Sequence, residues 1–96
     1  MAQVRVTPRR RFAQFLIFSP AAVEIDDTPV GRVRWGKPET FTVPAGRHRL
    51  TVSFPYLGKA RTGVASVELD LAEGQTVEAT YRSPWIVTSH GSIQLT

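Results

Sequence analysis

The sequence predicts an all-β protein, a single antiparallel β-sandwich of seven to eight short strands. Apolar and polar residues alternate along most of the chain, and turn residues separate the alternating segments at spacings of about 8–12 residues. No window of 11 residues has apolar side chains at helical spacing and is also free of Gly and Pro. With 96 residues, the chain is long enough for one domain with its own core. A small β-barrel is the second choice.

The first elements are a basic segment and two strands. Residues 1–11 are expected to form a basic N-terminal segment, with a short strand at 3–6 as an option, and residues 12–96 the sandwich domain. Phe12–Phe18 is rich in aromatic residues, which are frequent in strands, and Val23–Asp26 follows after a break.

The segment DDTPVG, which begins at Asp26, predicts a turn. Asp side chains bond their own backbone in turns, and Pro fixes φ. No calcium loop of the form D-x-[DN]-x-[DN]-G surrounds Asp26 and Asp27, so we expect a turn and no metal site here. Gly31–Trp35 then alternates, with Val33 and Trp35 on one face of a strand.

Residues 40–54, with the sequence TFTVPAGRHRLTVSF, predict a β-hairpin. Phe41 and Val43 share a face, and Pro44-Ala45-Gly46 fits a three-residue connection in which Gly46 has a positive φ. The returning strand has an apolar face, on which His48 lies at the margin of the core, and a polar face.

The C-terminal part repeats this pattern. The segment PYLGKARTG predicts a loop of about nine residues, which is long for a hairpin. Alternation returns at Val67–Leu71 and, after the turn AEGQ, at Val77–Tyr81. Trp85–Thr88 and Ser92–Leu95 complete the expected strands.

These motifs resemble the PEGA-type small β-sandwich domains. The resemblance covers residues 15–81 and rests on FSPAAVEIDDTPVGRV, FTVPAGRHRLTVSF and VELDLAEGQTVEATY. The chain is also similar to short uncharacterised actinobacterial proteins with a Trp-Gly and a Tyr-x-x-Pro, here Trp35-Gly36 and Tyr81–Pro84. Where the PEGA-type pattern has Asp-Gly, this chain has Asp26-Asp27. The resemblance implies a bacterial, non-catalytic accessory or binding module, often associated with the envelope, and no particular ligand.

The chain carries little that could catalyse a reaction. It contains two His and no Cys, so a zinc site would need carboxylates from distant strands. Ser89 adjoins His90, but neighbours in a strand or turn point apart, whereas a catalytic triad needs spatial convergence. No G-x-S-x-G elbow and no glycine-rich phosphate loop are present. We expect no enzyme, no cofactor and no metal.

Positive charge is concentrated in the first half of the chain. Residues 1–48 carry eight basic and four acidic side chains, and residues 49–96 carry four of each. Two groups of arginines are candidates to bind an anionic partner. They are Arg9, Arg10 and Arg11 near the N-terminus, and Arg32, Arg34 and Arg49 on the polar faces of predicted strands. The alternative function is therefore nucleic-acid binding by outward-facing arginines on neighbouring strands. It is disfavoured because the aromatic residues needed for base stacking share the apolar faces.

The segment around Arg9–Arg11 also resembles the start of a secretory signal, and RRRF resembles the twin-arginine pattern. The apolar run that follows has only about seven residues and fits a strand. We therefore expect no cleavage and favour the cytoplasm over the cell envelope. The chain has no run of about 20 apolar residues, so we expect no transmembrane segment.

The preferred function is a non-catalytic module for protein–protein interaction or self-association. In SPWIVTS both faces of the expected strand are apolar, and Pro84 favours an edge position. Aromatic residues are frequent anchors at protein interfaces. The candidate partner-binding residues are Trp85, Ile86, Tyr81 and Tyr56. The alternative for Trp85 is a core residue that caps the open end of the sandwich.

Overall fold

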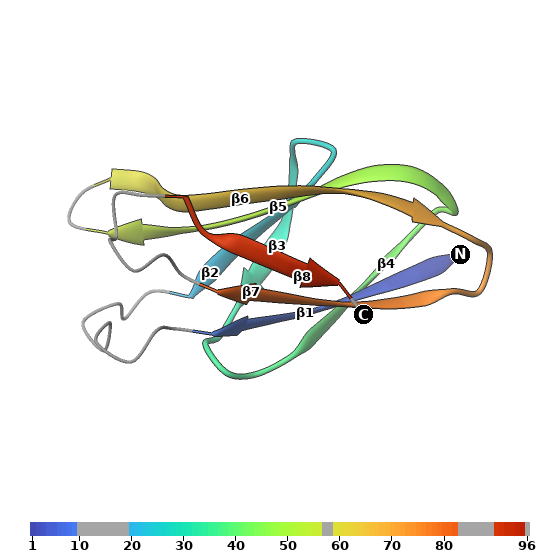
Figure 1. The fold of residues 1–96 in the computed structure, drawn as a ribbon, viewed down its shortest axis with the longest axis horizontal. Helices are drawn as coiled ribbons and strands as arrows, with labels where there is room; N and C mark the ends of the chain where they lie inside the picture. Colours follow the sequence, from blue (N-terminus) through green and yellow to red (C-terminus); the bar gives the residue numbers. More distant parts are fainter. Residues whose placement is uncertain (10–19, 57–58, 83–89, 96) are drawn as a thin grey trace.

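The chain folds into two four-stranded β-sheets that pack face to face (Figure 1). The structure, a computed structural model, describes residues 1–9, 20–56, 59–82 and 90–95. Its strands are β1 (Ala2–Arg9), β2 (Ala21–Ile25), β3 (Thr28–Val33), β4 (Glu39–Val43), β5 (Gly46–Tyr56), β6 (Lys59–Leu71), β7 (Thr76–Arg82) and β8 (Ser92–Leu95). Sheet A has the order β4-β1-β7-β8, and sheet B has the order β3-β2-β5-β6. The predicted all-β sandwich is confirmed, and the sheets are not closed into a barrel.

β1 is an inner strand of sheet A. It pairs antiparallel with β4 and parallel with β7. Val4 and Val6 are buried and alternate with the exposed residues Gln3 and Arg5, as expected for a strand with one face on a core. The strand has eight residues and so extends beyond the expected segment 3–6. The strand expected at Phe12–Phe18, and the start of the domain expected at residue 12, lie outside the described residues.

β2 and β3 form a hairpin with a two-residue turn. Asp26 and Asp27 have φ angles of 54° and 64°, the left-handed values that a type I′ turn requires at both central positions. The turn predicted within DDTPVG is confirmed at Asp26 and Asp27, whereas the rest of this segment belongs to β3, which ends at Val33 and not at Trp35. Trp35, just beyond β3, packs against the core as its phase predicted.

The predicted hairpin between residues 41–43 and 47–54 is wrong. β4 pairs with β1 in sheet A, whereas β5 pairs with β2 and β6 in sheet B. Pro44 and Ala45 thus carry the chain from one sheet to the other. The predicted positive φ of Gly46 is confirmed at 127°. Alternation identified both strands correctly, but it does not say which strands pair.

The predicted nine-residue loop is also wrong. β5 runs to Tyr56 and β6 starts at Lys59, and these two residues are paired in the ladder. Register shifts between Val52 and Phe54 and between Phe54 and Tyr56 mark this part of the ladder as irregular. Such bulges interrupt the alternation from which a strand is recognised, so the pattern does not reveal how far the two strands extend.

The core lies between the sheets and is aliphatic except for an aromatic group near one end. Trp35 meets Phe54 edge to face, with 5.6 Å between ring centroids, and lies 6.0 Å from Tyr81. The Tyr81 hydroxyl donates a hydrogen bond of 2.5 Å to the Gly63 carbonyl. Burial raises the pKa of Tyr81 well above its ordinary value, so this hydroxyl keeps its proton. A Cβ on Gly91 would lie 2.6 Å from the Tyr81 ring, so only glycine fits there.

The predicted strands at Val67–Leu71, Val77–Tyr81 and Ser92–Leu95 are confirmed within β6, β7 and β8. No helix in the described part of the chain is long and apolar enough to span a membrane.

Candidate functional site

The most connected polar group of the described residues lies where the β2–β3 turn meets the start of β5. The Nδ1 atom of His48 is 2.6 Å from Oδ2 of Asp26, and its Nε2 is 2.7 Å from the Pro44 carbonyl oxygen. The other oxygen of Asp26, Oδ1, accepts the backbone N–H of Arg49 at 2.9 Å. His48 therefore links the turn of the β2–β3 hairpin to the crossing between the two sheets. We call these three residues, Asp26, His48 and Pro44, the histidine clamp.

The histidine clamp favours the charged form of the imidazole. Both ring nitrogens face oxygen acceptors, and a neutral imidazole has only one N–H to donate. The hydrogen bond to Asp26, and then the bond to the Pro44 carbonyl, raise the pKa of His48. The same hydrogen bond from His48, followed by the backbone N–H of Arg49, lowers the pKa of Asp26. Only 14% of the His48 side chain is exposed, which agrees with its predicted place at the core margin.

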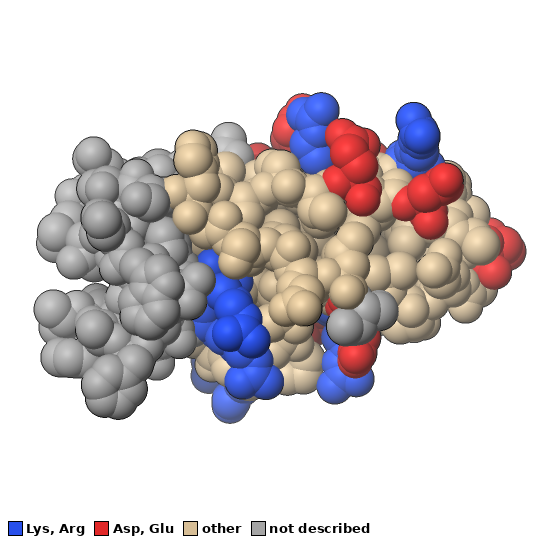
Figure 2. All heavy atoms as spheres, viewed as in Figure 1, with Lys and Arg blue, Asp and Glu red and all other residues tan. Residues whose placement is uncertain are grey.

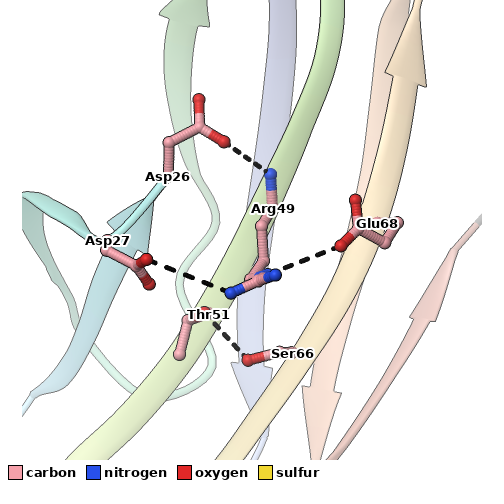
Figure 3. Close-up of polar contacts among 6 residues, drawn as sticks. All are labelled: Asp26, Asp27, Arg49, Thr51, Ser66 and Glu68. Atoms are coloured by element: carbon pink, nitrogen blue, oxygen red, sulfur yellow. Dashed lines mark hydrogen bonds and ion pairs between the residues drawn. The ribbon is translucent and has the colours of Figure 1, made fainter.

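Next to the clamp, Arg49 lies between two carboxylates (Figure 3). Its guanidinium is 3.4 Å from Glu68 on β6 and 4.0 Å from Asp27 in the turn. These side chains, together with Asp26, Arg47 and His48, line an open hollow of about 230 Å³. Two residues further along β5, Thr51 and Ser66 share a hydrogen bond of 2.9 Å across the ladder. The acidic and basic side chains that line the hollow balance one another in charge when His48 is protonated.

The clamp resembles the carboxylate–imidazole pair of a general base, but it lacks a free nitrogen. Nε2, the atom that would take a proton from a nucleophile, is already bonded to the Pro44 carbonyl. Within residues 1–9, 20–56, 59–82 and 90–95, no three His, Asp or Glu side chains come together to hold a metal ion. The arrangement is suited to fixing a turn.

The arginines proposed for an anionic partner fall into separate places. Arg49 is exposed and lies within ion-pair distance of Glu68 and Asp27, and its role with an anionic partner stays a prediction. Arg32 on β3 is exposed, but β2 lies between β3 and β5. The expectation that arginines of β3 and β5 lie on neighbouring strands is therefore wrong. Arg34 is exposed in the connection that follows β3.

The arginines near the N-terminus are only partly described. Arg9, the last residue of β1, is exposed, and its Cα partner on β7 is Arg82. Arg10 and Arg11 lie outside the described residues. Figure 2 shows Lys and Arg side chains gathered where the arrowheads of β1 and β7 end.

Tyr81 must be removed from the predicted partner-binding set. Its side chain is fully buried, and its hydroxyl is bonded to Gly63. Tyr56 belongs to β5, but its side chain is not among those described, and Trp85 and Ile86 also lie outside the described residues. Their role as anchors stays a prediction.

The edges of the two sheets offer a different contact surface. Apart from Met1, the exposed large apolar side chains of the described residues are Val30, 40% exposed on β3, and Leu95, 38% exposed on β8. Both strands are edge strands in the described sheets. β3 has Pro29 and a register shift against β2, features that protect an edge from pairing. β8, with the sequence SIQL, has no proline, no charged residue and no register shift against β7.

The sequence alone reveals only part of the histidine clamp and only part of the β8 edge. The phase of His48 and the turn at Asp26 are both visible in the pattern, but nothing in the sequence joins them, because the contact spans 22 positions. The alternation at the end of the chain identifies β8, but an edge position follows from strand order, which the pattern does not contain.

Comparison of the chain with protein-family models, with curated proteins and with solved structures finds no match.

Proposed function

We propose that this chain is a non-catalytic β-sandwich module that binds another protein, or a second copy of itself, by accepting a strand at the edge of β8. The observation that carries the proposal is the composition of β8: a short edge strand of the described sheet with an exposed Leu95 and with no proline, no charged residue and no register shift against β7. In strand addition, backbone hydrogen bonds supply much of the affinity, and alternate side chains supply the specificity. A strand paired with β8 would also cover Leu95.

The other edges are less suited to this role. β3 is protected by Pro29 and its register shift. β6 carries Glu68 and Asp70, and β4 begins at Glu39, so a strand added at either edge must accommodate exposed carboxylates.

Two further points support a module without a reaction of its own. The nitrogen of His48 that would act as a base is bonded to a backbone carbonyl. The PEGA-type resemblance implies an accessory or binding module, and that assignment is part of the proposal.

The test compares two edge variants that make the same chemical change. Leu95→Lys places a charge on β8, and Val30→Lys places one on β3 at similar exposure, 38% against 40%. The purified proteins are used to capture partners from a lysate of the native organism, with and without nuclease, and their self-association is measured by sedimentation. We expect Leu95→Lys to lose the captured protein or the self-association, while Val30→Lys and nuclease treatment leave both intact.

If Leu95→Lys captures the same protein and melts at the same temperature as the wild type, β8 is not the binding edge. Capture that nuclease abolishes replaces the proposal with the alternative, nucleic-acid binding by the arginines.

A further inference from the structure

The outer face of sheet A carries a ladder of polar side chains from β1 and β7. The two strands are parallel, and Gln3, Arg5, Thr7 and Arg9 stand directly opposite Thr76, Glu78, Thr80 and Arg82. The first pair is hydrogen-bonded at 3.4 Å, and the Arg5–Glu78 pair has a nitrogen–oxygen distance of 3.5 Å. The last pair consists of two arginines.

Among the residues that the structure describes, no acidic side chain pairs with Arg9 or Arg82. All eight acidic residues lie in the described part of the sequence, and the segments outside it contain no Asp or Glu. The ion pairs among the described residues involve other cations: the N-terminus, Arg5, His48 and Arg49. Like charges directly opposite one another destabilise a sheet. The described part of the protein therefore holds two cations side by side with no carboxylate side chain between them.

Hydrogen-bond donors surround this pair. β8 continues the row, because Ser92 is the Cα partner of Arg82 and its side chain lies on the same face of the sheet. The preceding row places the hydroxyls of Thr7 and Thr80 on that face as well. Arg9, Arg82 and Ser92 are all exposed. We call Arg9, Arg82 and Ser92 the arginine row.

Nearby basic residues add to the positive potential. The connection from β3 to β4 runs beside the end of β1, since the Gly36 N–H donates a hydrogen bond of 2.7 Å to the Pro8 carbonyl. This connection carries Arg34 and Lys37, both exposed. Figure 2 shows basic side chains over the ends of β1 and β7.

We propose that the arginine row binds a carboxylate of an acidic protein partner. The inference rests on the proposed function, because a strand added to β8 would end near Ser92, where the Gly91 N–H bonds the Gly63 carbonyl of β6, and would bring its last residue next to the row. That residue would stand two strand spacings, about 9.5 Å, from the Arg82 backbone. An extended Arg side chain and a Glu side chain can close this gap. An acidic residue at that position would fix the register of the added strand and relieve the repulsion between Arg9 and Arg82.

The neighbouring rows favour a single carboxylate over a nucleic-acid backbone. A phosphate chain needs cations repeated along its length. One row further, Thr7 and Thr80 are uncharged, and beyond them Arg5 is paired with Glu78. Within the described part of sheet A, the unpaired charge of this ladder is limited to its last pair.

The binding test uses a fluorescein-labelled hexaglutamate peptide as the probe, with hexaglutamine and hexathymidylate as comparisons, at about 50 mM salt. We expect the wild type to bind hexaglutamate, and Arg82→Gln and Arg9→Gln each to weaken it about fivefold. Arg32→Gln, which removes one exposed arginine from sheet B, is the matched control and should retain the wild-type affinity. Leu95→Lys should also bind the peptide, because it alters the edge of β8 and leaves the arginine row intact. The two proposals are therefore tested separately. Capture by Leu95→Lys tests strand addition at β8, and hexaglutamate binding by Arg82→Gln tests the arginine row.

A second readout follows from the repulsion in the free protein. Arg82→Glu places a carboxylate directly opposite Arg9, as Glu78 stands opposite Arg5. Its melting temperature at low salt should therefore rise, while hexaglutamate binding disappears. Three results would overturn the proposal: no binding of hexaglutamate by the wild type, equal losses in Arg82→Gln and Arg32→Gln, or tighter binding of hexathymidylate than of hexaglutamate.

Discussion

At the scale of single residues, backbone conformation explains much of what the side chains do. Asp26 and Asp27 both occupy the left-handed region, which is costly for residues other than glycine although Asp tolerates it better than most. The carboxylate of Asp26 accepts bonds from His48 and from the Arg49 backbone, so the same residue that makes the turn also fastens it to β5.

Gly46 provides a test at this scale. Its φ of 127° is available to glycine and strained for other residues, whereas the space around a Cβ there is empty. Gly46→Val should therefore lose about 1–3 kcal/mol of unfolding free energy through backbone strain. Urea denaturation measures this loss, with Ala45→Val, at the neighbouring exposed position, as the control. A loss below about 0.5 kcal/mol, the ordinary surface range, would refute the assigned conformation.

At the scale of elements, the β2–β3 hairpin depends on a turn made from two aspartates. β-Hairpins with this turn usually have Gly at the second position, where Asp27 stands here. Asp27 also contacts Arg49, but at 4.0 Å and with 78% of its side chain exposed, so this ion pair contributes little.

We expect Asp27→Gly to stabilise the protein by about 0.5–1 kcal/mol, because glycine adopts the left-handed conformation without strain. Asp27→Ala is the matched variant: it removes the same charge but keeps a Cβ, so it should be less stable than the wild type. Thermal and urea unfolding of both variants distinguish backbone strain from charge. Equal shifts in the two variants would mean that charge governs the position.

The strands could be predicted from the sequence, but their pairing could not. Alternation located β5, β7 and β8, and the burial of Val77, Ala79 and Tyr81 follows their predicted phase. It could not tell that Pro44 and Ala45 lead into another sheet, because a proline–glycine connection serves a hairpin and a crossing equally well. The arginine row could be predicted from the sequence even less well than the strand pairing. The Arg9–Arg82 pair depends on a parallel pairing between distant segments, and local patterns carry no such information.

At the scale of the whole molecule, the histidine clamp joins the β2–β3 hairpin of sheet B to the crossing from sheet A, so its ionisation affects the entire fold. The groups around it are Asp26, Asp27, Glu68, Arg47 and Arg49. Asp26, whose pKa is lowered by the hydrogen bond from His48, keeps its negative charge across the range from about pH 5.5 to about pH 8.5. A change in stability across this range that depends on the clamp therefore belongs to His48.

The sign follows from the raised pKa of His48. Its contribution to stability should be complete below its unfolded pKa of about 6.5, and should be lost as the pH rises through the higher folded value. The lowered pKa of Asp26 retains the carboxylate partner down to about pH 4. The difference in unfolding free energy between the wild type and His48→Gln should therefore be larger at pH 5.5 than at pH 8.5. A difference that is constant with pH would contradict the clamp, and His90, present in both proteins, cancels in the comparison.

The parallel pairing of β1 with β7 has a consequence for how the protein is made. During synthesis β1 leaves the ribosome first, but its partner β4 follows only after residue 43, and β7 only after residue 82. The β2–β3 and β5–β6 hairpins join strands that are neighbours in sequence, so they can form while β1 still lacks its partner β7. Sheet A closes last, so the backbone edge of β1 that pairs with β7 stays unpaired until late in translation, when it is open to pairing with other chains.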